Sequence, residues 1–143
     1  MKVFLILLIA LPFYAGVSAC GQSTAGEQQA AAEDRAENKV EVYYFHFERR
    51  CVSCINVQKA TEKVLKENYG QELREGTIVY HEVNLSNTES REIAQKLDVG
   101  RQGLLVVNGN EKEDLTMQGF MFASRDYDRF KEALDETILK LSN

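Results

Sequence analysis

The sequence is poor in three residue types and in positive charge. Its 143 residues include no Trp, a single Pro and only three Cys. The single proline is Pro12, so no later turn can use a proline ring or a cis X-Pro bond. Three cysteines are too few for paired zinc ribbons, a ferredoxin-type cluster or a disulfide-dense mini-protein. The formal net charge of −5 argues against a nucleic-acid partner, which requires a basic face.

The first residues have the pattern of an export signal. Lys2 supplies a positive charge, and residues 3–15 are almost wholly apolar before a short run of small residues. These are the parts of a secretory signal peptide. A transmembrane helix fits less well, because the apolar run falls short of the ~20 residues that a span prefers and contains Pro12. We therefore expect residues 1–19 to be a signal peptide.

A lipid attachment site is predicted where the apolar run ends. The string VSAC, which ends at Cys20, resembles the bacterial lipobox, in which the chain is cut before the cysteine and a lipid is joined to its sulfur. The alternative is plain secretion, with cleavage near Ala19 and a free Cys20. The next residues, Gly21 to Asn38, contain no large apolar side chain and cannot fold alone. Residues 20–38 are thus expected to be a lipidated cysteine and a flexible tether. They place the protein in the bacterial cell envelope, anchored on the periplasmic side of the inner or outer membrane.

Residues 39–143 have the pattern of one packed domain. Of the whole chain, 44% is apolar, which is enough to form a core. Runs of β-branched and other apolar residues predict strands over 40–47, 78–85, 104–107 and 115–117, with a hairpin turn at Asn108-Gly109. Apolar residues every three or four positions predict helices over 51–69, 89–97 and 126–141. Gly70 is expected to end the first helix. The order β-α-β-α-β-β-α predicts an α/β fold, a four-stranded mixed sheet with helices on both faces.

One motif indicates a reactive site: the sequence C-V-S-C, which begins at Cys51 and ends at Cys54. Three residues apart on the first turn of a helix, the two sulfurs face the same side and can bridge. Free amide groups and the helix dipole favour a thiolate at this end of a helix, and Arg49 and Arg50 add positive charge. We expect Cys51 to have a lowered pKa and to attack, and the more buried Cys54 to act as resolving thiol.

Two other interpretations of the cysteine pair remain open. A structural disulfide would close a very short loop and stabilise little. A site for a metal or metalloid, such as copper, zinc or arsenite, could use Cys51, Cys54, His46 and His81. The two histidines lack the paired spacing of zinc motifs, and each is also explained as an ordinary strand residue. A CxxC motif beside a βαβ pattern favours the redox interpretation.

The order of elements and motifs resembles the thioredoxin fold over residues 39–143. The stretch VNLSNTESREIAQKLDVGRQGLLVVNGN is similar to the family's second strand through its hairpin, and Gly119 lies at a glycine that follows the family's last strand. Within this fold, RRCVSC after an aromatic strand resembles the nitrophenyl compound nitroreductase subunit ArsF family. The thioredoxin resemblance implies thiol–disulfide exchange with protein thiols or disulfides and with an unidentified redox partner. The sequence has no flavin or nicotinamide motif, and we expect no cofactor.

The sequence also departs from thioredoxin around the predicted site. Thioredoxins have a Trp-Cys-Gly-Pro-Cys motif with a cis-proline opposite it. Here Arg50 replaces the Trp, Val52-Ser53 replaces Gly-Pro, and the cis-proline position falls near Gln102. A cis bond without proline costs ~2.5–4 kcal/mol, so this loop is expected to be trans. Gln102 and Gly103 are predicted to form an adaptable substrate loop, and clients are expected to dock more weakly than in thioredoxin or in a different way.

Overall fold

The computed structural model describes residues 39–143. The predicted signal peptide (1–19), the lipidation of Cys20 and the tether (20–38) lie outside the described residues. Within residues 39–143, no helix is long and apolar enough to cross a membrane.

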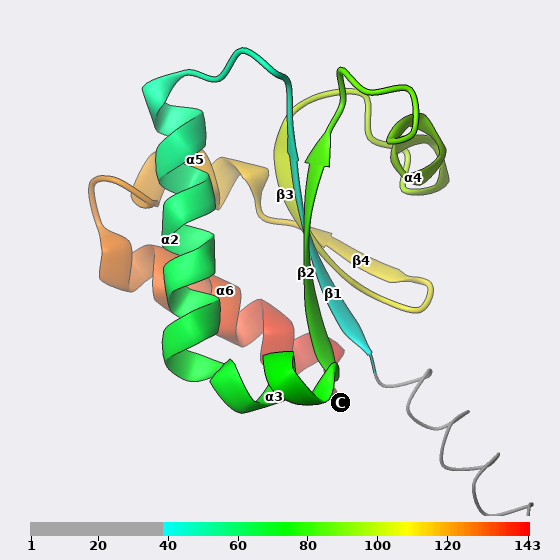
Figure 1. Ribbon diagram of the computed structural model, residues 1–143. Coiled ribbons are helices and arrows are strands. Elements are labelled where there is room, and N and C mark those ends of the chain that lie inside the picture. Colours follow the sequence, from blue (N-terminus) through cyan, green and yellow to red (C-terminus); the bar gives the residue numbers. More distant parts are fainter. Residues whose placement is uncertain (1–38) are drawn as a thin grey trace, which may run out of the picture.

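The centre of the molecule is a four-stranded mixed sheet with the strand order β2-β1-β3-β4 (Figure 1). β1 (Val40–His46) pairs in parallel with β2 (Ile78–Asn84) and antiparallel with β3 (Gly103–Asn108). β3 also pairs antiparallel with β4 (Glu111–Asp114). A parallel β1-α-β2 unit followed by an antiparallel hairpin is the thioredoxin-like arrangement, so the predicted fold class is confirmed.

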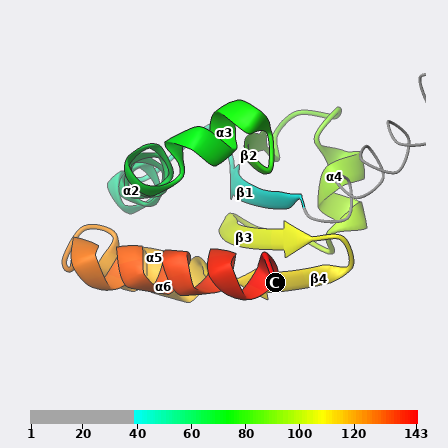
Figure 2. The same cartoon turned by 90° about the horizontal axis from the view of Figure 1, so that it is seen from below.

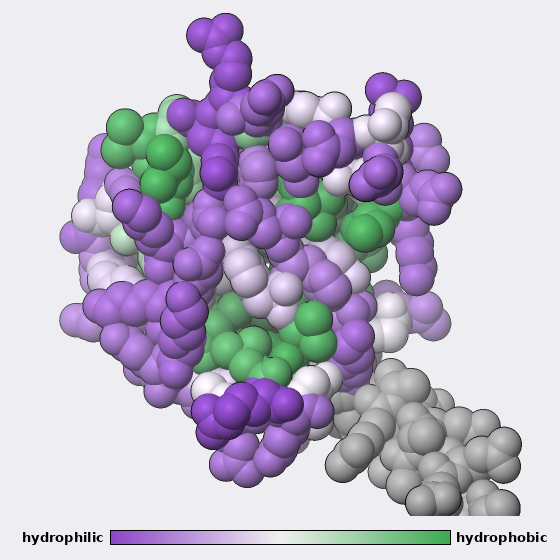
Figure 3. Space-filling model, in the orientation of Figure 1, coloured by the Kyte–Doolittle hydropathy of each residue, from purple (hydrophilic) through white to green (hydrophobic). Residues whose placement is uncertain are grey.

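Helices cover both faces of the sheet, as predicted. The five helices of the described part are α2 (Val52–Asn68), α3 (Gly70–Glu75), α4 (Arg91–Lys96), α5 (Thr116–Phe122) and α6 (Tyr127–Leu141). α2, α5 and α6 lie on one side of the sheet, and α4 lies on the other (Figures 1 and 2). The face seen in Figure 3 is mostly hydrophilic, with separate small apolar patches, because most large apolar side chains lie inside.

Alternation along β1 divides the apolar side chains between two cores. Val42 and Tyr44 face α2 and α6 in the larger core, and Tyr43 and Phe45 face the smaller core beneath α4. Both faces of this central strand are therefore covered, which explains why its aromatic and β-branched run has no regular polar position. β1 ends at His46, where the chain leaves the sheet for the cysteine motif.

The predicted return strand over 115–117 is wrong. The strand is Glu111–Asp114, and Thr116 begins helix α5. Asn108 pairs with Glu111, so Gly109 and Asn110 form a two-residue turn, with Gly109 at φ 57°. β4 lies at the sheet edge and consists of charged residues, which protect an edge from pairing with other chains. An apolar pattern does not mark such a strand.

The predicted role of Gly70 is also wrong. α2 ends at Asn68, and Gly70 begins the short helix α3 instead of closing the structure. The left-handed terminating glycine is Gly76, at φ 76°, one residue after α3 ends. The chain continues as helix because Tyr69 is buried in the larger core and Leu73 packs against it.

Gly119 follows the last strand, β4, as the resemblance implies, and lies inside α5. A Cβ atom built there would lie 3.0 Å from Cγ1 of Val57 and 3.8 Å from Cε2 of Phe130. The missing side chain lets α5 lie close against α2 and α6, under the site described next.

Candidate active site

The cysteine pair lies at the start of α2, directly after the loop that follows β1. Cys51 is the N-cap residue, with extended backbone, and its Sγ accepts a hydrogen bond from the backbone N–H of Cys54 at 3.4 Å. The two Sγ atoms lie 2.6 Å apart and both residues are free cysteines. A disulfide has its sulfurs about 2.05 Å apart, so the pair can close one with little movement. The predicted bridging geometry at the helix start is present.

The two thiols differ in exposure and acidity. Cys51 is exposed, whereas Cys54 is 1% exposed. Hydrogen bonds donated to Cys51 by the Cys54 thiol and by the backbone N–H groups of Cys54 and Ser53 lower the pKa of Cys51. Burial, and then the interaction with Cys51, raise the pKa of Cys54. This asymmetry is the one expected of an attacking and a resolving thiol.

The predicted contribution of Arg50 to the thiolate stays a prediction, and the guanidinium has partners of its own. Its Nη1 donates to Oε1 of Glu82 at 2.9 Å and also to Oε1 of Gln58. Hydrogen bonds at the helix start, led by those from Cys54, lower the pKa of Cys51. Arg49 is exposed, and its role remains a prediction.

The predicted substrate loop lies against the buried cysteine. Sγ of Cys54 donates to Oε1 of Gln102 at 3.4 Å. All peptide bonds within residues 39–143 are trans, as expected for this loop without proline. Gly103 differs from the prediction, because it is buried at the start of β3 and not part of an adaptable loop. A Cβ atom there would lie 2.5 Å from Oγ1 of Thr116.

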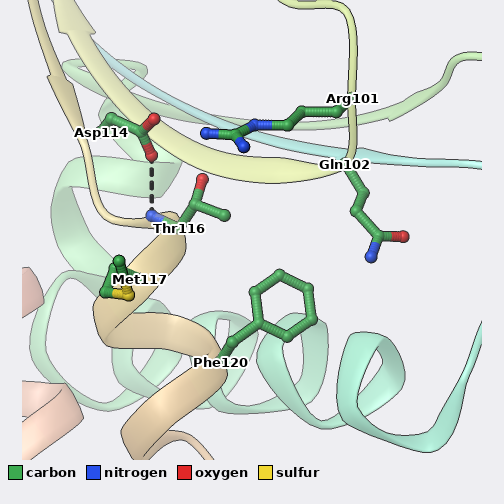
Figure 4. A pocket seen from close by; sticks show the side chains of 6 residues that line it. All are labelled: Arg101, Gln102, Asp114, Thr116, Met117 and Phe120. Carbon is green, nitrogen blue, oxygen red and sulfur yellow. Dashed lines mark hydrogen bonds between the residues drawn. The ribbon is translucent and has the colours of Figure 1, made fainter.

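An open groove of about 440 Å³ begins beside Gln102. Its lining side chains are Arg101, Gln102, Asp114, Thr116, Met117 and Phe120, from the loop before β3, the end of β4 and the first turns of α5 (Figure 4). Because Gln102 also contacts Cys54, the groove starts next to the cysteine pair. The sequence prediction missed this wall, since residues of α5 were assigned to a strand. The available signal was Asp114, whose Oδ1 accepts from the N–H of Thr116, the first residue of the helix.

Apolar side chains are also exposed on either side of the motif. Val52, next to Cys51 in sequence, is 73% exposed, and Phe47 in the preceding loop is 41% exposed. Phe47 lines a second, smaller hollow of about 210 Å³ together with Leu85 and Val99. Val52 is thus an exposed apolar side chain next to the attacking cysteine in sequence, and Phe47 belongs to a separate hollow.

The histidines of the alternative metal site are not brought together. His46 lies with Tyr44 on the α2 face of the sheet, and its Nε2 lies 3.0 Å from Oε1 of Glu82. His81 pairs with Tyr43 in the sheet register and stacks on that ring, so it lies on the opposite face. Across residues 39–143, no three His, Cys, Asp or Glu side chains form a group that could hold a metal ion. Both histidines are strand residues, as the sequence also predicted.

Comparisons with known proteins return structures only. No protein-family model and no curated protein matches the chain. The chain is similar to a thioredoxin of Fasciola hepatica, with 17% identity over 80% of this chain and 91% of that chain and a TM-score of 0.47. A thioredoxin of Thermus thermophilus has 22% identity over 79% and 84%, with a TM-score of 0.43. Trxlp of Edwardsiella tarda has 14% identity over 74% and 91%, with a TM-score of 0.44. The thioredoxin-like fold assigned to this chain rests on its own strand order and pairing.

Proposed function

We propose that this chain is a membrane-anchored thioredoxin-like protein that exchanges thiols and disulfides in the cell envelope. The observation that carries the proposal is the cysteine pair itself. An exposed Cys51 with a lowered pKa lies at a helix start, 2.6 Å from the sulfur of a buried Cys54. This geometry supports attack by one thiolate and closure of a disulfide by the other.

The exchange proceeds in two displacements. The Cys51 thiolate attacks one sulfur of a client disulfide, forms a mixed disulfide and releases the other client sulfur as a thiolate, which takes up a proton. Cys54 then loses its proton and attacks Sγ of Cys51, which releases the second client thiolate and leaves a Cys51–Cys54 disulfide. Two electrons pass to the client, and a redox partner must return the pair to the dithiol. The same steps in reverse oxidise a client dithiol.

Gln102 contributes to this sequence at the resolving thiol. Its amide oxygen lies 3.4 Å from Sγ of Cys54 and can accept the thiol proton when Cys54 does not donate it to the Cys51 thiolate. The client is proposed to lie along the groove that begins at Gln102, with its disulfide over Cys51. Met117 and Phe120 give the groove an apolar lining, which suits an apolar side chain of the client.

A redox titration of the mature protein tests the proposal. Equilibration with mixtures of reduced and oxidised glutathione is expected to convert both cysteines from alkylatable to protected in a single two-electron step. The measurement is the mass shift after alkylation in denaturant, and the matched control is the Cys51→Ser, Cys54→Ser double variant, which shows no step. Cysteines that stay alkylatable across the whole range contradict the redox function.

We also propose that the chain is a lipoprotein and a relative of the ArsF family. The support is the VSAC string before a polar linker, and the RRCVSC motif after β1. Cys20→Ala is expected to move the protein from the membrane pellet to the soluble fraction and to abolish labelling by radioactive palmitate, because the lipid has no sulfur to join. Cys51→Ser is the control and keeps both properties. A Cys20→Ala protein that stays labelled in the membrane refutes the anchor.

A further inference from the structure

A cluster of polar and charged side chains lies beside the cysteine loop, centred on Glu82 of β2. Oε1 of Glu82 accepts from Nη1 of Arg50 at 2.9 Å and lies 3.0 Å from Nε2 of His46. Its second oxygen, Oε2, accepts from Nε2 of Gln58 at 2.9 Å. Glu82 therefore joins the residue before Cys51, the end of β1 and the second turn of α2.

The position of Arg50 in this cluster has a consequence for its sequence neighbour. Arg50 directly precedes Cys51, and a free guanidinium there would stabilise a thiolate through its charge. Glu82 and Gln58 hold the guanidinium instead, and the carboxylate balances its charge. With side chains 29% and 37% exposed, Arg50 and Glu82 are only partly screened by water.

The other groups near Arg50 do not neutralise its guanidinium charge by direct contact. Nε2 of Gln58 also donates to Oε1 of Glu62, which places a second carboxylate behind the cluster. Burial raises the pKa of Tyr44 to about 12 and raises that of Tyr80 further, so both phenols are neutral near pH 7. His46 shares Oε1 of Glu82 with Arg50. Glu82 is thus the carboxylate in direct contact with the guanidinium.

We propose that Glu82 is a positioning residue that holds the Arg50 guanidinium away from Cys51 and so limits the stabilisation of the Cys51 thiolate. For its consequence in exchange, the inference rests on the proposed redox function. A more stable thiolate stabilises the reduced pair and makes the protein a stronger oxidant. By withholding Arg50, Glu82 keeps the pair more reducing than an arginine beside the attacking thiol would make it.

The pH profile of Cys51 alkylation tests this inference in the reduced, full-length protein. Iodoacetamide reacts with the thiolate, so a lower pKa moves the rise of the rate to lower pH. Glu82→Gln removes the carboxylate charge that balances the guanidinium and is expected to make alkylation about three- to tenfold faster at pH values below the wild-type midpoint. Arg50→Gln removes the cation and leaves the Glu82 carboxylate unbalanced, so it is expected to give no gain in alkylation rate below the wild-type midpoint. The Glu82→Gln, Arg50→Gln double variant is expected to return to the wild-type profile.

The double variant separates this role from a direct effect of the Glu82 charge. If the Glu82→Gln, Arg50→Gln double variant is still alkylated faster than the wild type below its midpoint, Glu82 acts on Cys51 without Arg50 and the inference is overturned. A Glu82→Gln profile identical to the wild type also overturns it. Glu82→Asp keeps a carboxylate on a shorter side chain and is expected to give an intermediate shift, which keeps the test open if Glu82→Gln does not fold.

Failure here is distinguishable from failure of the proposed function. Alkylation requires no client, no disulfide and no turnover. A pair that resists the glutathione titration but shows the predicted Glu82 shift refutes the redox function alone. A pair that titrates normally and shows no shift refutes only the role of Glu82.

Discussion

Cys54→Ser is expected to capture clients as mixed disulfides, because the second displacement then has no thiol. Cys51 is exposed and attacks as before, but the bond between Cys51 and the client cannot be resolved from inside the protein. Turnover falls to the level of a buffer control while a covalent adduct accumulates. The measurement is a non-reducing gel of cells that express the full-length variant, in which bands of higher mass collapse when a reductant is added.

Two matched variants check the direction of attack. Cys51→Ser is expected to lose both turnover and adducts, since Cys54 is 1% exposed and cannot reach a client disulfide. The variant with both serines reports any adduct formed through Cys20. Adducts formed by Cys51→Ser but not by Cys54→Ser would show that the assigned roles are reversed.

The strands with apolar and β-branched runs could be predicted because burial imposes that composition. β1 is buried on both faces, and its run of Val, Tyr and Phe has no other explanation. β4 could not be found in the same way, since an edge strand needs only hydrogen bonds from β3 and its side chains remain in water. The predicted strand therefore falls on Leu115–Met117, where α5 begins. As a result, the sequence does not predict α5, which supplies part of the groove wall.

The chemistry of the site was visible only where it is local in sequence. Cys51 and Cys54 lie within one helical turn, so their spacing alone predicts that the sulfurs face each other. The partner of Arg50 is 32 residues away, and its position depends on the parallel register that pairs Tyr44 with Glu82. No local pattern indicates that register. The contact between Arg50 and Glu82 therefore could not be predicted from the sequence.

Phe130→Ala is expected to lower the free energy of unfolding strongly, because Phe130 packs against the helices that carry the site. Phe130 of α6 is fully buried, and its ring lies 3.8 Å from the Cβ position of Gly119, where α5 meets Val57 of α2. Removing a buried aromatic ring costs the transfer energy of the lost atoms and leaves a cavity, together about 3–5 kcal/mol. Small domains have a free energy of unfolding of about 5–15 kcal/mol, so a large part of the total would be lost.

Urea unfolding of the reduced mature protein measures this loss. Leu139→Ala is the control on the same helix, because Leu139 is 58% exposed and its truncation is expected to change the unfolding free energy by less than about 0.5 kcal/mol. A Phe130→Ala loss no larger than that of the control would show that α6 does not support α2 and α5 in the way described. If the loss is large, α2 is also expected to separate from the core more readily. Cys54, on the first turn of that helix, then becomes alkylatable at a lower urea concentration than in the wild type.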